Sequence, residues 1–349
     1  MARDGAFWYN TAHMKILDIG GVAVEGVYAC VPAHEVDVVA SLRPLVGDKA
    51  EGVVEATGIR FRRVAEAGTG AFDLCAAAAE RLLPACAAKL GTSLGEYAQT
   101  FGAVVFVSFT ERTRMPSAAA RAQALLNLPR DVIALDLSLA CSGWVSGLHL
   151  AALLARETGR RVLLLDGDVQ STRIGEGDSS TLPLLADGGT ATVVAPSRDS
   201  APWRFAFLGD GEKGGALRLD EGGTIAMDGF GVFKFVASEV SAFLKEFISA
   251  ASESAFDAFV PHQANIYMVR QLAKSLGIAP ERLWTSGERL GNLASASVPA
   301  TIAACAPAAL RAGRSLRLLA SGFGGGLSAS AALLSLGPGT CVEIFDYGR

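Results

Sequence analysis

The chain has 349 residues, of which 50% are hydrophobic and 19% are charged, and its mean hydropathy is +0.34. This composition excludes a disordered chain, which combines low hydrophobicity with high net charge. The net charge of −4 and the lack of any Lys/Arg run in the sequence argue against nucleic acid as a partner.

Membrane insertion and export are not expected either. The longest charge-free stretch near the C-terminus, Leu318–Leu336, contains four glycines, so we predict two buried strands joined by a glycine loop rather than a membrane span. Met1–His13 has no apolar core of signal-peptide length. The six cysteines show no CxxC spacing, which argues against disulfides and metal ligation. We expect a soluble, cytoplasmic protein without a metal or cofactor.

Short apolar strands alternate with helices along the chain, and this pattern predicts an α/β protein with buried parallel strands. The first half predicts strands at Gly102–Phe109, Asp131–Leu137 and Arg161–Asp166, with helices at Pro116–Leu128 and Ser142–Ala155. The second half predicts strands at Asp257–Pro261 and Leu316–Ser321, helices at Asn265–Leu276 and Ser295–Ala309, and a further segment at Leu283–Gly291. Asp166-Gly167-Asp168 is interpreted as a turn.

The two halves repeat one pattern. Ser108 and His262 are 154 positions apart, as are Leu164 and Leu318, and Cys141 and Asn292 are 151 apart. We therefore predict two similarly built halves, at 14–197 and 198–349. Helices packed between two sheets must be small and apolar, and we assign that place to the alanine-rich segments at Ala76–Ala79, Ala118–Ala120 and 142–155.

Cys141 lies between a predicted strand and a predicted helix, where the helix N-terminus favours the thiolate form of a cysteine. His262 occupies a similar strand-to-helix junction in the second half, and Asn292 precedes another helix. The repeat would bring Cys141 and Asn292 to equivalent, facing helix ends. The glycine cluster Gly322–Gly326 could supply backbone N–H groups beside the thiol as an oxyanion hole.

These residues carry a resemblance to the thiolase superfamily, and within it to β-ketoacyl-acyl-carrier-protein synthase III (KAS III). The matching segments run in family order over 134–333: ALDLSLACSGW (134–144), LLADGGTATVV (184–194), MDGFGVFKF (227–235), VPHQANIYMVRQLAKSLGI (260–278), GNLASASVPATI (291–302) and GFGGGLSASAAL (322–333). The resemblance implies a thiolase-like five-layered α-β-α-β-α fold and a homodimer. It also implies a triad of Cys141, His262 and Asn292, and an oxyanion hole formed by the N–H groups of Cys141 and Gly325.

The implied activity is that of an acyltransferase in lipid or secondary-metabolite biosynthesis. Cys141 would accept an acyl group from an acyl thioester, either acyl-CoA or acyl-ACP. A malonyl thioester would then lose carbon dioxide, with N–H donors from His262 and Asn292 stabilising the enolate. In this scheme His262 acts mainly as a neutral hydrogen-bond donor, with a secondary part in removing the proton of Cys141. Acyl carrier protein is an expected partner.

Several positions depart from the family pattern. The Trp and Arg that hold the nucleotide of coenzyme A are matched here by Gly52 and Ala56, and a basic residue is matched by Tyr267. These differences leave the choice between coenzyme A and a carrier protein open. Met115 and Trp144 replace common aromatic residues, so we expect them to shape a remodelled acyl pocket.

Three alternatives remain from the sequence. The first is a KAS III-like acyltransferase that passes the acyl group from Cys141 to an oxygen or nitrogen nucleophile without decarboxylation. The second is a papain-like cysteine hydrolase, whose nucleophile, base and amide occur in the same Cys-His-Asn order. Against it, the glutamine expected six residues before the nucleophile is Leu135. The third is a non-catalytic subunit of a heteromeric synthase, which the intact triad argues against.

Overall fold

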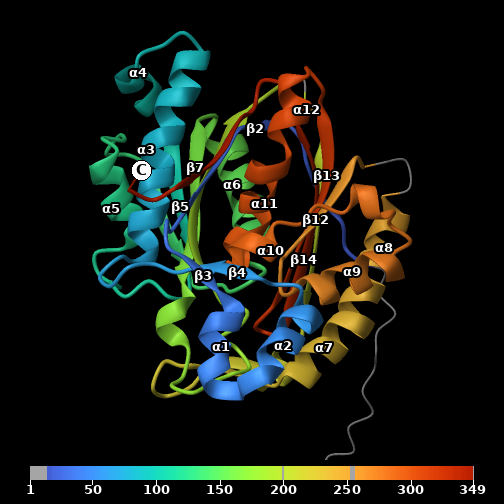
Figure 1. The fold of residues 1–349 in the computed structure, drawn as a ribbon. Coiled ribbons are helices and arrows are strands. Elements are labelled where there is room, and N and C mark those ends of the chain that lie inside the picture. The colour runs from blue at the N-terminus through green and yellow to red at the C-terminus, as the bar shows by residue number, and fades with distance from the viewer. Residues whose placement is uncertain (1–13, 199, 252–255, 349) are drawn as a thin grey trace, which may run out of the picture.

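The computed structural model describes residues 14–198, 200–251 and 256–348, so the predicted absence of a signal peptide in Met1–His13 falls outside the described residues. Two sheets form the body of the protein, separated by helices and covered by further helices on their outer faces (Figure 1). This is the α-β-α-β-α layering of the thiolase fold, as predicted. Among the described residues, no helix is long and apolar enough to cross a membrane.

The first sheet has six strands in the order β15-β2-β8-β7-β5-β6. Their bounds are β2 Val22–Val31, β5 Phe101–Val107, β6 Ile133–Leu137, β7 Arg161–Val169, β8 Asp187–Pro196 and β15 Cys341–Asp346. The second sheet has five strands in the order β1-β9-β14-β13-β12. Their bounds are β1 Leu17–Ile19, β9 Trp203–Gly209, β12 Ala258–Pro261, β13 Leu316–Gly324 and β14 Ser328–Leu336.

The two sheets have the same topology, which explains the sequence repeat. In the first sheet β5 runs parallel to β7, and β7 runs antiparallel to β8; in the second, β12 runs parallel to β13, and β13 antiparallel to β14. A parallel bridge between Phe259 and Leu283 occupies the position that β6 takes beside β5. The charge-free stretch near the C-terminus forms β13 and β14, joined at the glycine cluster as predicted.

The domain boundary at residue 197 stays a prediction. The N-terminal strand β1 pairs with β9 in the second sheet, whereas the C-terminal strand β15 pairs with β2 in the first. Each half therefore contributes one strand to the sheet of the other half, and the two halves share their secondary structure as well as a core.

The helices form three layers. Between the sheets lie α6 Gly143–Thr158 and α11 Ser297–Cys305, followed by α12 Pro307–Arg311. The outer face of the first sheet carries α3 Ala71–Lys89 and α5 Ala118–Leu125, with α4 Leu94–Ala98 beside them. The second sheet is covered by α8 Ser241–Ala250 and α9 Ile266–Ser275. The remaining elements are α1 Val38–Val46, α2 Ala50–Thr57, α7 Gly229–Phe235, α10 Gly287–Leu290, and the two-stranded pairs β3 Glu35–Asp37 with β4 Phe61–Arg63 and β10 Leu217–Leu219 with β11 Ile225–Met227.

The placement of the alanine-rich helices corrects one prediction. The alanines of α6 pack in the core between the two sheets, as expected. Ala76–Ala79 and Ala118–Ala120 instead belong to α3 and α5, which cover the outer face of the first sheet. A small apolar face is needed for close packing on a sheet wherever the helix lies, so alanine content alone does not distinguish an inner layer from an outer one.

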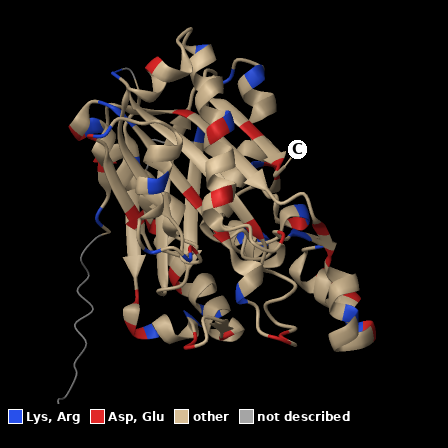
Figure 2. Ribbon diagram, turned by 90° about the vertical axis from the view of Figure 1, so that its left-hand side faces the viewer, with Lys and Arg blue, Asp and Glu red and all other residues tan. Residues whose placement is uncertain are grey.

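Charged side chains lie mostly on the outer elements, with Lys/Arg and Asp/Glu interspersed (Figure 2). The exceptions matter for the site. Asp166 and Asp168 belong to β7, which continues through the predicted turn to Val169, and both are fully buried.

Candidate active site

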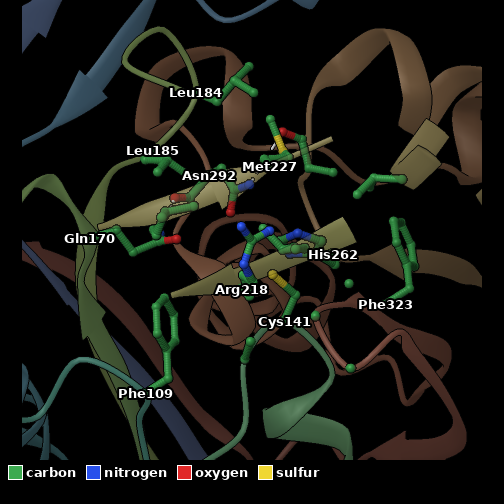
Figure 3. Close-up of a pocket in the computed structure, with 18 of the residues that line it drawn as sticks. Phe109, Cys141, Gln170, Leu184, Leu185, Arg218, Met227, His262, Asn292 and Phe323 are labelled. Carbon is green, nitrogen blue, oxygen red and sulfur yellow. Dashed lines mark hydrogen bonds between the residues drawn. The ribbon is translucent and has the colours of Figure 1, made fainter. Parts of the chain in front are cut away.

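One cavity of about 470 Å³ lies where the carboxyl ends of strands from both sheets meet. Its lining includes Cys141, His262 and Asn292 together with the glycine cluster, and is otherwise mostly apolar. Figure 3 shows the thiol of Cys141, the imidazole of His262 and the amide of Asn292 directed into this one space. The structure therefore brings together the three residues that the sequence singled out.

Cys141 lies in the turn between the end of β6 at Leu137 and the start of α6 at Gly143, as predicted. The N–H of Gly143 donates to the carbonyl oxygen of Ala140 (2.7 Å), which closes the turn around the cysteine. The Cys141 side chain is buried but reaches the cavity. The helix therefore presents the thiol at its N-terminal end.

Burial dominates the acidity of this thiol. Loss of hydration, with a smaller contribution from the nearby carboxyl of Asp168, raises the pKa of Cys141 to about 12. The backbone N–H groups of Cys141 and Gly325 hydrogen-bond to the sulfur and oppose that shift. The expected thiolate-favouring effect of the helix N-terminus is therefore outweighed in the free protein, and Cys141 is a thiol at neutral pH.

Two glycines of the cluster lie so close to Cys141 that a side chain there is excluded. A Cβ on Gly322 would lie 2.6 Å from the carbonyl oxygen of Cys141, and one on Gly324 would lie 3.1 Å from its sulfur. A Cβ on Gly325 would meet only ordinary contacts, the nearest at 3.4 Å. Glycine is thus required at the first two positions for close approach, while Gly325 directs its N–H toward the sulfur.

His262 follows β12 directly, and its own N–H donates to the backbone oxygen of Ser321 on β13 (2.7 Å). The imidazole packs edge-on against Phe323, and Nδ1 lies 2.9 Å from the backbone oxygen of Ala294. A carbonyl oxygen only accepts, so Nδ1 carries the proton and Nε2 of the neutral ring is an acceptor. Burial lowers the pKa of His262 to about 4, which keeps the ring neutral at pH 7.

Asn292 is held on both its backbone and its side chain. Its N–H donates to the backbone oxygen of Leu184 (2.8 Å), and its Oδ1 accepts the N–H of Ala294 (2.9 Å). This second bond fixes the amide orientation, so that Nδ2 is the donor available toward the cavity; its other contact is a longer bond to the Ala264 oxygen (3.4 Å).

Ala294 connects the two polar side chains. Its carbonyl accepts from His262 and its N–H donates to Asn292, while its own φ of 50° lies in the left-handed region. The backbone of Ala294 thereby orients both the His262 and the Asn292 side chains. A non-glycine residue with positive φ gives no recognisable signal in a single sequence.

The comparisons with known proteins agree with this geometry. The family model for 3-oxoacyl-[acyl-carrier-protein] synthase III matches residues 135–211, and the model for its C-terminal part matches residues 249–336. A β-ketoacyl-[acyl-carrier-protein] synthase III from Serratia proteamaculans is 30% identical over 309 residues, covering 84% of this chain and 93% of the relative. The chain belongs to the synthase III family.

Further relatives support the membership. A β-ketoacyl-[acyl-carrier-protein] synthase III from Roseiflexus sp. strain RS-1 is 33% identical over 315 residues, covering 84% of this chain and 92% of the relative. The crystal structure of a 3-oxoacyl-(acyl-carrier protein) synthase from Burkholderia xenovorans is similar over 95% of this chain and 99% of its own, with a TM-score of 0.89 and 32% identity. The family match rules out the papain-like alternative.

Neither predicted acyl-pocket residue lines the cavity of this synthase III chain. Trp144 is 1% exposed, lies in the core between the sheets and donates from Nε1 to the hydroxyl of Thr192 (3.2 Å). Met115 is 89% exposed, outside the cavity. Trp144 therefore packs α6 into the core between the sheets. That either residue contacts an acyl group stays a prediction.

Two cavity features of this synthase III chain were missed in the sequence. Gln170, the first residue after β7, donates from Nε2 to the backbone oxygens of Asn292 (2.7 Å) and Ala186 (2.9 Å), and thereby connects the two halves beside the cavity. Asp168 accepts through Oδ1 from the hydroxyls of Ser108 and Thr110 (both 2.8 Å), and so fixes the turn that carries the cavity residue Phe109. Both lie beyond the predicted end of β7.

Proposed function

We propose that this chain is a decarboxylating β-ketoacyl synthase III, which loads an acyl group on Cys141 and extends it with a malonyl thioester. The observation that carries the proposal is the convergence of the Cys141 thiol, the Nε2 acceptor of His262, the Nδ2 donor of Asn292 and the N–H of Gly325 on one apolar cavity. Family membership and the names of the relatives support the same chemistry.

In the first half-reaction, Nε2 of His262 accepts the proton of the Cys141 thiol as the sulfur attacks the acyl carbonyl carbon. The N–H groups of Cys141 and Gly325 donate to the oxyanion of the tetrahedral intermediate. When the bond to the carrier sulfur breaks, the leaving thiolate takes the proton from His262, which returns to its neutral form. The base role follows from the hydrogen bond at Nδ1 and differs from the mainly donor role that the resemblance implies.

In the second half-reaction, a malonyl thioester enters the same cavity and loses its carboxylate as carbon dioxide. The electron pair of the broken bond forms an enolate, whose oxygen accepts from Nδ2 of Asn292. The enolate carbon then attacks the acyl-Cys141 carbonyl, and the carbon–sulfur bond breaks to release the 3-oxoacyl thioester. Cys141 takes up a proton from solvent to restore the thiol.

For the donor thioester, we propose only whether its acyl group is bound to coenzyme A or to a carrier protein. The positions matched to coenzyme A recognition are exposed: Gly52 and Ala56 on α2, and Tyr267, 51% exposed, on α9. A Cβ on Gly58, which ends α2, would touch Ile266 at 2.7 Å, so α2 and α9 lie side by side. None of these three positions offers a cation, which supports a carrier-bound donor in a specialised lipid or secondary-metabolite pathway. Acyl carrier protein is the partner we propose.

We also propose a homodimer, formed through the free edge of the first sheet. The edge strand β6 exposes Ile133 (40%) and Leu135 (38%), an apolar pattern that unpartnered edge strands generally avoid. Asp136 on this strand accepts the N–H groups of Ala118 and Ala119, which places the segment that follows Met115 at the same edge. A second copy paired here would cover Met115 as well, and light scattering of the wild type and of Leu135→Glu tests this.

The activity is tested by following both half-reactions. The chain is incubated with acyl thioesters on coenzyme A and on carrier protein, and acyl-Cys141 is detected by intact mass. Malonyl thioester is then added, and carbon dioxide and the 3-oxoacyl product are measured. Cys141→Ala should abolish the adduct, whereas Cys305→Ala, a cysteine outside the cavity, should keep it. An acyl-enzyme that never yields carbon dioxide would support transfer to an oxygen or nitrogen nucleophile instead.

A further inference from the structure

The cavity contains one side chain with a permanent charge. Among the described residues that line it, Arg218 is the only Lys, Arg, Asp or Glu. Its neighbours on the hairpin, Leu217, Leu219, Ile225 and Met227, are apolar and line the cavity too. Arg218 lies on β10, opposite Ala226 of β11. A cation is unusual in such an apolar lining, and neither half-reaction described above assigns it a role.

Arg218 lies on the hairpin that packs against the oxyanion-hole loop. Leu217, its neighbour on β10, lies against the glycine cluster: its backbone oxygen would be 3.7 Å from a Cβ on Gly325, and its Cδ2 3.9 Å from a Cβ on Gly324. The same Gly324 position is 3.1 Å from the sulfur of Cys141. The hairpin therefore packs against the oxyanion-hole loop, and Figure 3 draws Arg218 among the residues that line the same cavity as Cys141 and His262.

The guanidinium has no counter-ion within the described part of the chain. Its one hydrogen bond there runs from Nη1 to the backbone oxygen of Gly215 (2.9 Å). A guanidinium has five N–H donors, so most of them are left for water or a ligand. Arg218 is exposed, so water hydrates it when the cavity is empty. An apolar acyl chain would displace that water without replacing its hydrogen bonds, whereas an anionic group would pair with the cation.

We propose that Arg218 binds a carboxylate at the far end of the acyl group, so that this synthase selects an acidic acyl donor. The inference rests on the proposed function and names its substrate class. The malonyl carboxylate is the less suitable ligand, because it leaves as carbon dioxide. A contact that stabilises that carboxylate in the ground state is lost in the transition state and slows decarboxylation. The carboxylate of the acyl donor persists through both half-reactions.

The test compares acyl groups of equal shape that differ in charge. Succinyl is paired with 4-methylpentanoyl, and glutaryl with 5-methylhexanoyl, because an isopropyl group approximates the shape of a carboxylate. All four are supplied on the same carrier without malonyl thioester, and the rate of acyl-Cys141 formation is measured by quenched intact mass. The variants are Arg218→Gln, Arg218→Lys and Arg218→Glu. The matched control is Arg130→Gln, an exposed arginine that does not line the cavity.

The readout is the ratio of acidic to neutral loading within each pair. Wild type and the control should favour the acid, and Arg218→Gln should lower the ratio about tenfold, the scale of a charge-assisted hydrogen bond at a partly hydrated site. Arg218→Lys should keep part of the preference, and Arg218→Glu should lower the ratio further by repulsion. Thermal denaturation confirms that each variant is folded.

Two results would overturn the inference. One is a wild type that loads both members of each pair equally, and the other is a ratio that no Arg218 substitution changes. An effect confined to the malonyl KM would also overturn it, because it would assign Arg218 to the extender. Failure of the proposed function looks different, since the wild type would then form no acyl-Cys141 with any of the four thioesters.

Discussion

Gly324 closely approaches the side chain of Cys141, and Gly324→Ala tests this contact. The added Cβ would lie 2.9 Å from Cβ and 3.1 Å from Sγ of Cys141. Non-bonded atoms of this kind separate to about 3.5–4.0 Å, so the sulfur or the glycine loop must move by roughly 0.5 Å or more. The displaced sulfur would no longer be aligned with the N–H of Gly325.

The expected result is slower acylation. Misplacement of a reacting group by about 1 Å costs around 100-fold in rate, so a shift of half that size should slow acyl-Cys141 formation by about 10- to 100-fold. The overpacking should also lower the free energy of unfolding by about 1–3 kcal/mol. Quenched intact mass gives the acylation rate with a saturating acyl thioester, and urea denaturation gives the stability.

Gly325→Ala is the matched control. Its Cβ would meet Ala140 Cβ at 3.4 Å and no closer atom, and alanine keeps the backbone N–H that faces the sulfur. We expect its acylation rate to stay within about threefold of wild type, the range of a substitution without a steric conflict. Equal rates for Gly324→Ala and Gly325→Ala would refute the assignment of the close approach to Gly324.

Three further predictions concern charge and backbone geometry. Because burial raises the pKa of Cys141 to about 12, its alkylation by iodoacetamide should accelerate about tenfold per pH unit from pH 7 to 10; a plateau below pH 8, seen by peptide mass, would contradict a neutral thiol. Ala294→Gly should keep acylation, whereas Ala294→Val should lose stability by about 1–2 kcal/mol in urea, because a β-branched residue resists φ of 50°. Burial raises the pKa of Asp168 from 3.8 to about 7, so this carboxyl loses its proton at a lower pH in the unfolded chain than in the folded one. The free energy of unfolding should therefore fall as the pH rises from about 4 to about 7, by up to about 4 kcal/mol in total. Asp168→Asn should flatten that slope, and an unchanged slope would exclude Asp168 as its source.

Much of the architecture could be predicted from the sequence because strand and helix signals are local. The turn that carries Cys141 and the junction that carries His262 follow from apolar runs and their ends, and the structure confirms both positions. The internal repeat then predicts facing halves, since equivalent segments occupy equivalent places in two similar sheets. These conclusions need no knowledge of side-chain contacts.

Other features depend on contacts between distant segments. Asp166 and Asp168 have the composition of a turn, yet β8 pairs with them and buries both in β7. Trp144 lies in the first turn of α6, and only the tertiary contacts show that its side chain packs in the core between the sheets. Arg218 lies within a hairpin of two three-residue strands, and only the packing of Leu217 on the glycine loop brings this hairpin to the cavity.

These distant contacts determine the resting state of the site. Burial raises the pKa of Asp166 and Asp168 and lowers that of His262, so each of these groups is shifted toward its neutral form behind or beside the thiol. Burial likewise disfavours a thiolate at Cys141, which explains why the free thiol is weakly acidic. The proton must leave together with attack on a bound thioester, when the N–H groups of Cys141 and Gly325 receive the new negative charge on oxygen. A site built in this way is unreactive without substrate. It follows that the permanent charge of Arg218 is better suited to choosing the acyl group than to activating the sulfur.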